Sequence, residues 1–382
     1  TLYEMRRPPK GLIVLIAEFE RAPDALAVDY SRRIQAGILQ VLRELEVEGV
    51  YVERTDEVYS EENARVRAAV HKASIVIYGW YDDAGINPRF ELVRAPQQYV
   101  PILKQAGVGL ASLDRLEVRL DKELKEMSYI AAAAIGLVYL ADGQSSRALT
   151  FFDLALDSLP GGTLLMGKEG VYFYKASCHF YEYQFAEAVT ALEEAVRINR
   201  DFYAAHLNLA IAYNAACDTA RALEEANVAL ALKPDSPDAQ QLRGFLLARE
   251  NRWAEAADAY AEALKLSPDS AAIHSALAQA HEKLGRLDEA AAEYKKALEL
   301  ADTRLKAQPD DPQAIAAHAD ILFSQGELDE AAAQYQQAID RALALKLRPD
   351  RLAWFYRSLG LIRWQQERWP EAIQAYSQAI SL

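Results

Sequence analysis

Four acidic side chains near the start of the chain are the first candidates for chemistry. Glu18 and Glu20 lie at the end of one apolar run, and Asp82 and Asp83 directly follow another. If both runs are parallel strands, their carboxyl ends form the edge where ligand sites of α/β folds usually lie. Clustered carboxylate oxygens there could hold Mg²⁺ or Ca²⁺. Strand ends are commonly polar, and we favour solvated loop acids, so we predict no metal ligand.

Motifs for other chemistry are absent from the sequence. His274 and His281 lie seven residues apart without an evident third ligand, which favours packing histidines over a metal site. Cys178 and Cys217 lie in apolar segments, where buried thiols are favoured over a disulfide and indicate a reducing cytoplasm. The chain contains no GxGxxG, GxxxxGK[ST], GxSxG, HExxH or CxxC motif. We therefore predict no catalytic residue, no cofactor and no enzyme activity.

The charge of the chain is acidic and unevenly distributed. Of the net charge of −14, little comes from residues 1–125, which hold 18 basic and 20 acidic side chains, whereas the remainder holds 24 basic and 36 acidic ones. Binding to a phosphate backbone depends on Lys and Arg, so we predict no nucleic acid partner. No apolar run approaches the ~20 residues of a membrane helix, so no direct membrane insertion is expected. The chain begins with Thr1, and an upstream targeting or membrane segment could be missing.

The apolar runs predict a small α/β domain over residues 1–112. Short β-branched runs are typical of buried strands, and amphipathic segments between them are typical of helices. The expected strands cover residues 11–19, 49–54, 73–81 and 86–93, and the expected helices cover residues 24–47 and 60–72. This β-α-β-α-β-β order predicts a mixed sheet. Residues 113–128 are expected to form a connecting helix.

Residues 129–382 repeat one pattern seven times. In every copy an alanine is followed seven residues later by a second alanine and preceded twelve residues earlier by Gly or Ala. The first alanines are Ala148, Ala188, Ala222, Ala256, Ala290, Ala331 and Ala372, at spacings of 40, 34, 34, 34, 41 and 41. Each copy predicts two amphipathic helices that cross at the small residues, with an aromatic ring filling the space beside them. The spacings of 41 predict longer second helices, and residues 160–170 predict an inserted loop.

A period of 34 residues with these small positions resembles the tetratricopeptide repeat family. The resemblance covers residues 129–382 and implies an all-α solenoid, a right-handed superhelix of helix pairs, which makes the whole chain a multidomain α+β protein. The repeats are expected at about 129–162, 169–202, 203–236, 237–270, 271–311, 312–352 and 353–382. Residues 1–120, with the strand "IVIYGWYDD", resemble the TolB-type amino-terminal domain, which implies a bacterial origin and a sensing or docking role.

The resemblance also implies a partner-binding groove lined by the first helix of each repeat. Aromatic rings beside amide side chains suit an extended peptide or a helix, because amides can pair with the backbone while rings supply buried area. Carried onto this sequence, the groove positions are Phe173, Ser177, Phe180, Tyr181, Asn208, Ile211, Asn214, Asp238, Gln241, Phe245, Arg249 and Gln279. We expect these side chains to be more exposed than the repeated alanines.

These observations favour a non-enzymatic scaffold or adaptor that binds a protein or peptide in the groove. The alternative is a sensor, or a small-ligand or metal-binding protein, that acts through the amino-terminal domain while the repeats mediate self-assembly. We also expect the repeats to stay folded when residues 1–125 are removed. Ile373, Tyr376 and Ile380 of the last helix are expected to be covered by further chain or by a second copy, so a homo-oligomer is one candidate assembly.

Overall fold

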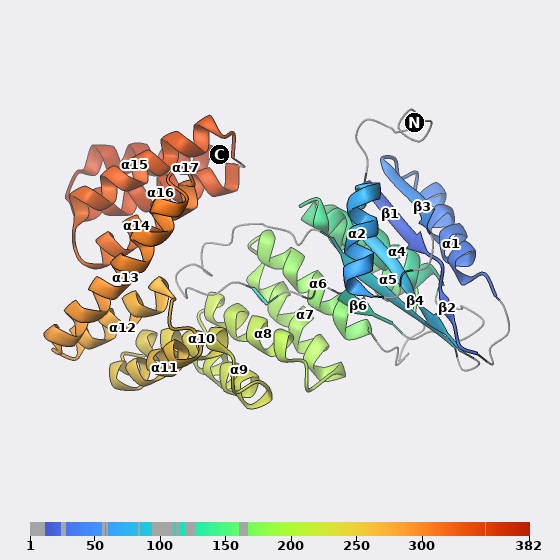
Figure 1. The fold of residues 1–382 in the computed structure, drawn as a ribbon, viewed down its shortest axis with the longest axis horizontal. Helices are drawn as coiled ribbons and strands as arrows, with labels where there is room; N and C mark the ends of the chain where they lie inside the picture. Colours follow the sequence, from blue (N-terminus) through green and yellow to red (C-terminus); the bar gives the residue numbers. More distant parts are fainter. Residues whose placement is uncertain are drawn as a thin grey trace. The chain divides into compact units, whose positions relative to one another are not determined.

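A computed structural model gives the structure of the chain (Figure 1). It describes residues 12–23, 28–55, 58, 60–82, 85–93, 110–111, 113, 115–118, 127–159, 167–347 and 349–382. The described residues up to Ala212 form one compact unit, and those from Tyr213 onward form a second.

A six-stranded mixed sheet occupies the first unit. Its strands are β1 (Leu12–Ala17), β2 (Glu20–Arg21), β3 (Val50–Thr55), β4 (Ile75–Tyr81), β5 (Ile86–Leu92) and β6 (Arg115–Glu117). The order is β3-β1-β4-β5-β6, with the short β2 paired to β4. β1, β3 and β4 are parallel, whereas β5 and β6 are antiparallel to their neighbours. The predicted mixed sheet is confirmed, with β2 and β6 as additions.

Helices cover both faces of this sheet (Figure 1). α2 (Glu61–His71) covers one face, where its Ala64 and Ala68 are buried with Leu15 of β1 and Val76 of β4. The alternate strand residues face α1 (Tyr30–Glu44) and α4 (Met127–Ala141), which pack on each other and on the sheet. This alternation of side chains is the ordinary consequence of the β pleat.

α4 belongs both to the sheet and to the repeats. Every residue from Tyr129 to Leu140 is buried, so the helix is covered on all sides. It packs against α1, β1, β4 and β5, and also against α5 (Ser145–Asp157), its partner in the first helix pair. Gly37 of α1 permits the close approach, because a Cβ there would overlap the Met127 side chain. The first helix pair therefore shares a core with the sheet, which argues against the expectation that the repeats stay folded without residues 1–125.

The prediction of a connecting helix over residues 113–128 is also wrong for the residues of this range that the structure describes. Arg115–Glu117 form strand β6, which pairs with β5, and Met127 already begins α4. Leu116 is buried against α6, where Gly170 leaves room for its side chain. Pairing with an existing sheet edge and burial of Leu116 therefore determine the conformation here, and neither is visible in the local sequence.

Seven successive helix pairs follow in the described part of residues 127–382. After α4 and α5, they are α6 (Lys168–Tyr181), α7 (Phe185–Ile198), α8 (Tyr203–Ala215), α9 (Thr219–Leu232), α10 (Pro237–Arg249), α11 (Trp253–Leu266), α12 (Ala271–Lys283), α13 (Leu287–Ala307), α14 (Pro312–Ser324), α15 (Leu328–Ala344), α16 (Pro349–Gln365) and α17 (Trp369–Ser381). α13 and α15 have 21 and 17 residues, which confirms the longer second helices. Most of the loop expected at residues 160–170 lies outside the described residues.

The small residues and rings meet as the repeat pattern predicts. A Cβ on Gly136 would lie 2.7 Å from the ring of Phe152, and a Cβ on Gly244 would lie 2.7 Å from the ring of Tyr260. The first alanine of every copy is buried. The helix crossings are therefore closely packed, and any larger side chain there would displace the ring.

The turn inside each repeat requires a left-handed backbone. The residue five positions before each first alanine has a φ between +58° and +83°. These residues are Gly143, Tyr183, Cys217, Asn251, Gly285, Gly326 and Glu367. An L-residue with a side chain pays about 1–2 kcal/mol for this conformation, whereas Gly does not.

We expect Gly285→Ala to lower the free energy of unfolding by about 1–2 kcal/mol. A Cβ at this position would meet nothing within 4 Å, so the cost comes from the backbone alone. The reverse change, Cys217→Gly, should leave stability unchanged or raise it by up to about 1 kcal/mol. Chemical denaturation of both variants measures the two effects, and an unchanged midpoint for Gly285→Ala would contradict this account of the turn.

Candidate functional site

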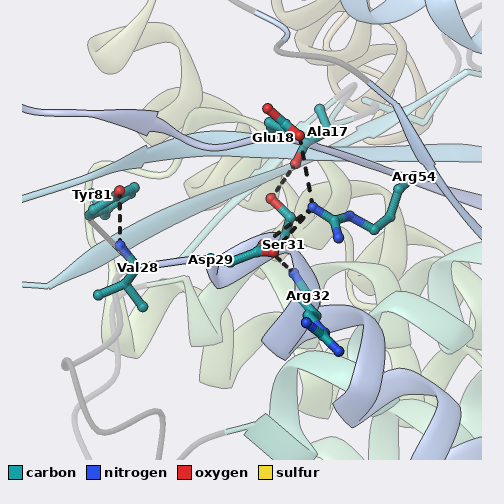
Figure 2. Close-up of polar contacts among 8 residues, drawn as sticks. All are labelled: Ala17, Glu18, Val28, Asp29, Ser31, Arg32, Arg54 and Tyr81. Carbon is teal, nitrogen blue, oxygen red and sulfur yellow. Dashed lines mark hydrogen bonds and ion pairs between the residues drawn. The ribbon is translucent and has the colours of Figure 1, made fainter.

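The carboxyl edge of the parallel strands holds a polar network around Arg54 (Figure 2). The Arg54 guanidinium lies 3.3 Å from the Asp29 carboxylate and 3.9 Å from that of Glu18. Asp29 also caps α1 by accepting a backbone N–H in its first turn. Ser31 donates its hydroxyl to the carbonyl oxygen of Ala17, at 2.9 Å. Both carboxylates already have partners within the chain, and the network fastens α1 to the ends of β1 and β3.

The other acidic candidates do not assemble into a metal centre. Glu20 is exposed in β2, and Asp82 accepts the backbone N–H of Gly85 at 2.9 Å, which stabilises a turn. Asp83 lies outside the described residues. Among the residues that the structure describes, no three His, Cys, Asp or Glu side chains are close enough together to hold a metal ion. The described carboxylates therefore have structural roles: they pair with Arg54 at the strand ends, stabilise a turn or cap a helix.

The surroundings of the histidine and cysteine candidates indicate roles in the fold rather than in chemistry. His274 contacts the Glu293 carboxylate at 2.5 Å and the carbonyl oxygen of Pro268 at 3.0 Å. Burial raises the pKa of the Cys178 thiol well above its usual range, so this thiol stays protonated and unreactive. Cys217 is exposed rather than buried, because it occupies the left-handed position of a turn. The expectation of two buried thiols is therefore wrong for Cys217.

Most of the side chains expected to line the groove are buried. Phe173, Ser177, Phe180, Asn208, Ile211, Asn214 and Gln241 are buried, Tyr181 and Phe245 are half-buried, and Asp238, Arg249 and Gln279 are exposed. The expectation that these side chains are more exposed than the repeated alanines is wrong for the seven buried ones and holds for the other five. In the first unit, aromatic contacts explain the burial: the ring centroid of Phe173 lies 5.3 Å from that of Phe202, and Phe180 lies 6.0 Å from Phe185.

In the second unit, two of these residues bind each other, and a third binds a residue outside the predicted set. Arg249 donates to the side-chain oxygen of Asn214 at 2.6 Å. Gln279 donates to the Ser324 hydroxyl at 2.9 Å. These contacts occupy polar groups that a partner would otherwise use.

Asn208 makes the most specific contact of the expected groove. Its side-chain oxygen accepts the backbone N–H of Ala111 at 2.8 Å, and its side-chain nitrogen donates to the carbonyl oxygen of Ala111 at 3.0 Å. Asn208 is only 1% exposed, so both hydrogen bonds are shielded from water. One carboxamide thus pairs with both polar groups of a single residue, as a neighbouring strand would.

Tyr174 of α6 makes a related contact that the sequence analysis missed. Its hydroxyl donates to the carbonyl oxygen of Leu113 at 2.8 Å, and the residue is buried. Tyr174 lies two residues before the small residue Ala176, as Asn208 lies two residues before Ala210. The two side chains therefore occupy the same repeat position in consecutive copies. Comparing repeat positions between copies would have identified Tyr174.

Comparison with protein families identifies the helical part of the chain. Three tetratricopeptide repeat models match residues 179–244, 243–312 and 312–382, which together make up more than half of the sequence. The chain belongs to the tetratricopeptide repeat family. The models match none of the residues before 179, so the resemblance of the amino-terminal domain to TolB-type domains stays a prediction. No curated protein is significantly similar to the sequence.

Solved structures match the chain at low sequence identity. One from Parabacteroides merdae ATCC 43184 is 18% identical, with a TM-score of 0.48, over 66% of this chain and 93% of that one. A crystal structure of MamA is 20% identical, with a TM-score of 0.42, over 45% of this chain and 97% of that one. A chain of the APC/C hetero-tetramer Cut9-Hcn1 is 18% identical, with a TM-score of 0.42, over 56% of this chain and 40% of that one.

Membership of the tetratricopeptide repeat family indicates a scaffold for protein interactions, with protein partners. Members of this family are typically non-enzymatic. In the part of the chain that the structure describes, no helix is both long and apolar enough to cross a bilayer. Ile373 and Ile380 of the last tetratricopeptide repeat are 66% and 85% exposed. Self-association through this helix stays a prediction, for which Ile373→Glu is a suitable probe.

Proposed function

We propose that the chain is a non-enzymatic adaptor whose α6 and α8 bind an extended segment of a partner protein. Asn208 and Tyr174 are the residues that recognise the partner backbone. The observation that carries the proposal is the pair of hydrogen bonds between the buried Asn208 carboxamide and Ala111. A buried side chain with this geometry is selective for an extended backbone, because an unpaired carboxamide there would be costly.

Aromatic side chains beside Tyr174 support the proposal. The ring centroid of Tyr174 lies 6.2 Å from that of Phe152 and 5.8 Å from that of Phe173. These neighbours hold the Tyr174 hydroxyl in place, so the side chain loses little conformational entropy when its hydrogen bond forms. Rigid aromatic residues next to hydrogen-bonding groups are typical of surfaces that recognise peptides.

The alternative, a sensor acting through the α/β domain, has less support from the described residues. Its candidate ligands were Glu18, Glu20, Asp82 and Asp83, and Glu18 and Asp82 have partners within the chain. Glu20 is exposed, and no group of three metal-ligating side chains occurs among the described residues. We therefore keep the adaptor as the proposed function and treat the α/β domain as the structure that supports it.

Selection of random twelve-residue peptides against the full-length protein tests the proposed function. The affinity of each selected peptide is then measured by fluorescence anisotropy with the wild type and with Asn208→Ala. Two hydrogen bonds contribute about 0.5–1.5 kcal/mol each, so the variant should bind about fivefold to 150-fold more weakly. Gln279→Ala is the matched control, because it removes an exposed amide at another expected groove position. Equal affinities for wild type and Asn208→Ala would contradict the proposal.

A further inference from the structure

Helix α13 in the second unit carries an open apolar stripe with acidic borders. Its residues Leu287, Ala291 and Leu298 follow one another at helical spacing and line a hollow of about 550 Å³. We propose that this stripe binds a basic amphipathic helix of a partner protein. The inference goes beyond the proposed function, because it concerns a second interaction surface that shares no residue with the site of Asn208 and Tyr174.

Leu287 is more exposed than its counterparts in the other repeats. It lies three residues before the first alanine of its copy and is 66% exposed. In five other copies the residue at this position is buried or half-buried: Ser145, Phe185, Thr219, Trp253 and Leu328. Trp369 of the last copy is 49% exposed. A large apolar side chain that is uncovered at a position normally packed inside the fold is typical of a surface that a partner covers.

The shape of the stripe favours a helix as its occupant. From Leu287 to Asp302 it extends about 22 Å along α13, at 1.5 Å per residue. Ala290 and Ala291 form part of its floor, and small residues let two helix axes approach closely. The backbone groups of α13 bond within the helix, so they offer no partner to an extended segment. A partner helix satisfies its own backbone, whereas an extended segment would leave polar groups unpaired against the apolar floor.

The charge of the borders favours a basic partner. Four carboxylates line the stripe, those of Glu282, Glu299, Asp302 and Glu327. Lys295 is the single basic residue in this lining. Residues 126–382 as a whole hold 24 basic and 36 acidic side chains, so the field around the stripe is negative. A helix with Lys and Arg beside its apolar face is therefore attracted to the stripe, and an acidic helix is repelled.

Two of the four carboxylates are available to a partner. The side chains of Glu299 and Glu327 are exposed, and neither has a hydrogen bond or an ion pair with another described residue. Asp302, by contrast, lies 3.2 Å from the ring of His318. Charged pairs at the border of an interface determine mainly which partner is accepted, while an apolar anchor at its centre supplies affinity. Leu287 is the anchor here, and Glu299 and Glu327 select the basic partner.

Contacts within the second unit fix the walls of the stripe. Tyr294 is buried in the middle of α13, and its hydroxyl lies 3.0 Å from the carbonyl oxygen of Ser324 and 3.3 Å from the Glu282 carboxylate. These contacts join α13 to α14 and α12. Burial and the Glu282 carboxylate raise the pKa of the Tyr294 hydroxyl, so it remains a donor at neutral pH. Because the walls are fixed before a partner arrives, binding costs little ordering entropy.

A synthetic fourteen-residue peptide of Lys and Leu, with Leu at helical spacing and a fluorescein label, is the probe. Its affinity for the full-length protein is measured by fluorescence anisotropy. We expect the double variant Glu299→Gln/Glu327→Gln to bind it about fivefold more weakly or worse. The control, Glu224→Gln/Asp258→Asn, removes the same charge from exposed carboxylates of α9 and α11 and should change the affinity by less than about twofold. Equal losses in the two double variants would overturn the inference.

Leu287→Gln tests the apolar anchor. We expect it to weaken binding of the probe about tenfold, because the buried apolar area is lost. Leu343→Gln on α15 is the matched control, since Leu343 is 51% exposed and lies outside the stripe. Both changes are at exposed positions, so both proteins should keep their helix content, which circular dichroism checks. An unchanged affinity for Leu287→Gln would show that the apolar stripe does not bind the peptide.

Two further ligands distinguish other occupants of the stripe. A peptide of the same composition in scrambled order should bind at least tenfold more weakly, and equal binding would exclude a helix as the occupant. Spermine should displace the probe only at large excess, and displacement at equal concentration would assign the stripe to small polycations instead. Asn208→Ala should leave the affinity for the probe unchanged. Failure at α13 and failure of the proposed function at Asn208 are therefore separate results.

Discussion

Removal of residues 1–126 is expected to unfold the first helix pair rather than release an intact array. The truncation uncovers the side of α4 that packs on α1, β1, β4 and β5. Burial of a Val, Leu or Ile side chain contributes about 1.5–3 kcal/mol, so uncovering three of them costs about 5 kcal/mol or more. That is comparable to the whole stability of a typical domain. Circular dichroism and sedimentation of the truncated protein should show lost helix content and aggregation.

A substitution in the intact chain provides the control for this prediction. Gly37→Leu should force α1 away from α4, because even a Cβ at this position would overlap Met127. Overpacking of this kind costs about 1–3 kcal/mol. Val66→Leu adds volume to a sheet-covering helix at a side chain that is 57% exposed, and it should change little. A truncated protein that stays monomeric and melts cooperatively at the wild-type temperature would show that α4 does not need the sheet.

Phe180→Ala is expected to lower the free energy of unfolding by about 3–5 kcal/mol. Phe180 is fully buried and packs edge-on against Phe185, so its removal leaves a cavity in the first unit. Trp364→Ala is the matched control, because Trp364 is also an aromatic residue of a first helix but is 52% exposed. Its loss should cost far less. Denaturant titration compares the two, and similar effects of both changes would mean that burial does not distinguish these positions.

The sequence was sufficient for the parts of the fold that depend on local periodicity. The spacing of Gly244 and Tyr260 within one repeat predicted a helix crossing, and the structure brings the two into contact. The runs that became β1 and β4 are likewise apolar over their own length. In both cases the residues that determine the structure lie within one repeat or one strand. Their spacing can therefore be read from a single sequence without knowledge of the tertiary fold.

Long-range contacts explain what the sequence did not predict. β6 forms because residues 115–117 reach the free edge of β5, more than twenty residues earlier in the chain. Asn208 was expected to face solvent, but it is covered by Ala111, from which it is 97 residues distant. Asn208 does form hydrogen bonds, but to the chain's own backbone, and its predicted role toward a partner stays a prediction. The identity of its present partner depends on tertiary packing, which periodicity does not record.

Because α4 packs both on the sheet and on the next repeat helix, it also limits how the array of helix pairs can change in length. An array of stacked helix pairs has an apolar surface at each end and needs something to cap it. Here the α/β sheet caps the amino-terminal end, since it covers the outer side of the first helix. Insertion or loss of a repeat next to the sheet would destroy that cap, whereas a duplication farther along leaves it intact. Repeat number in this architecture can therefore vary only in the direction away from the sheet.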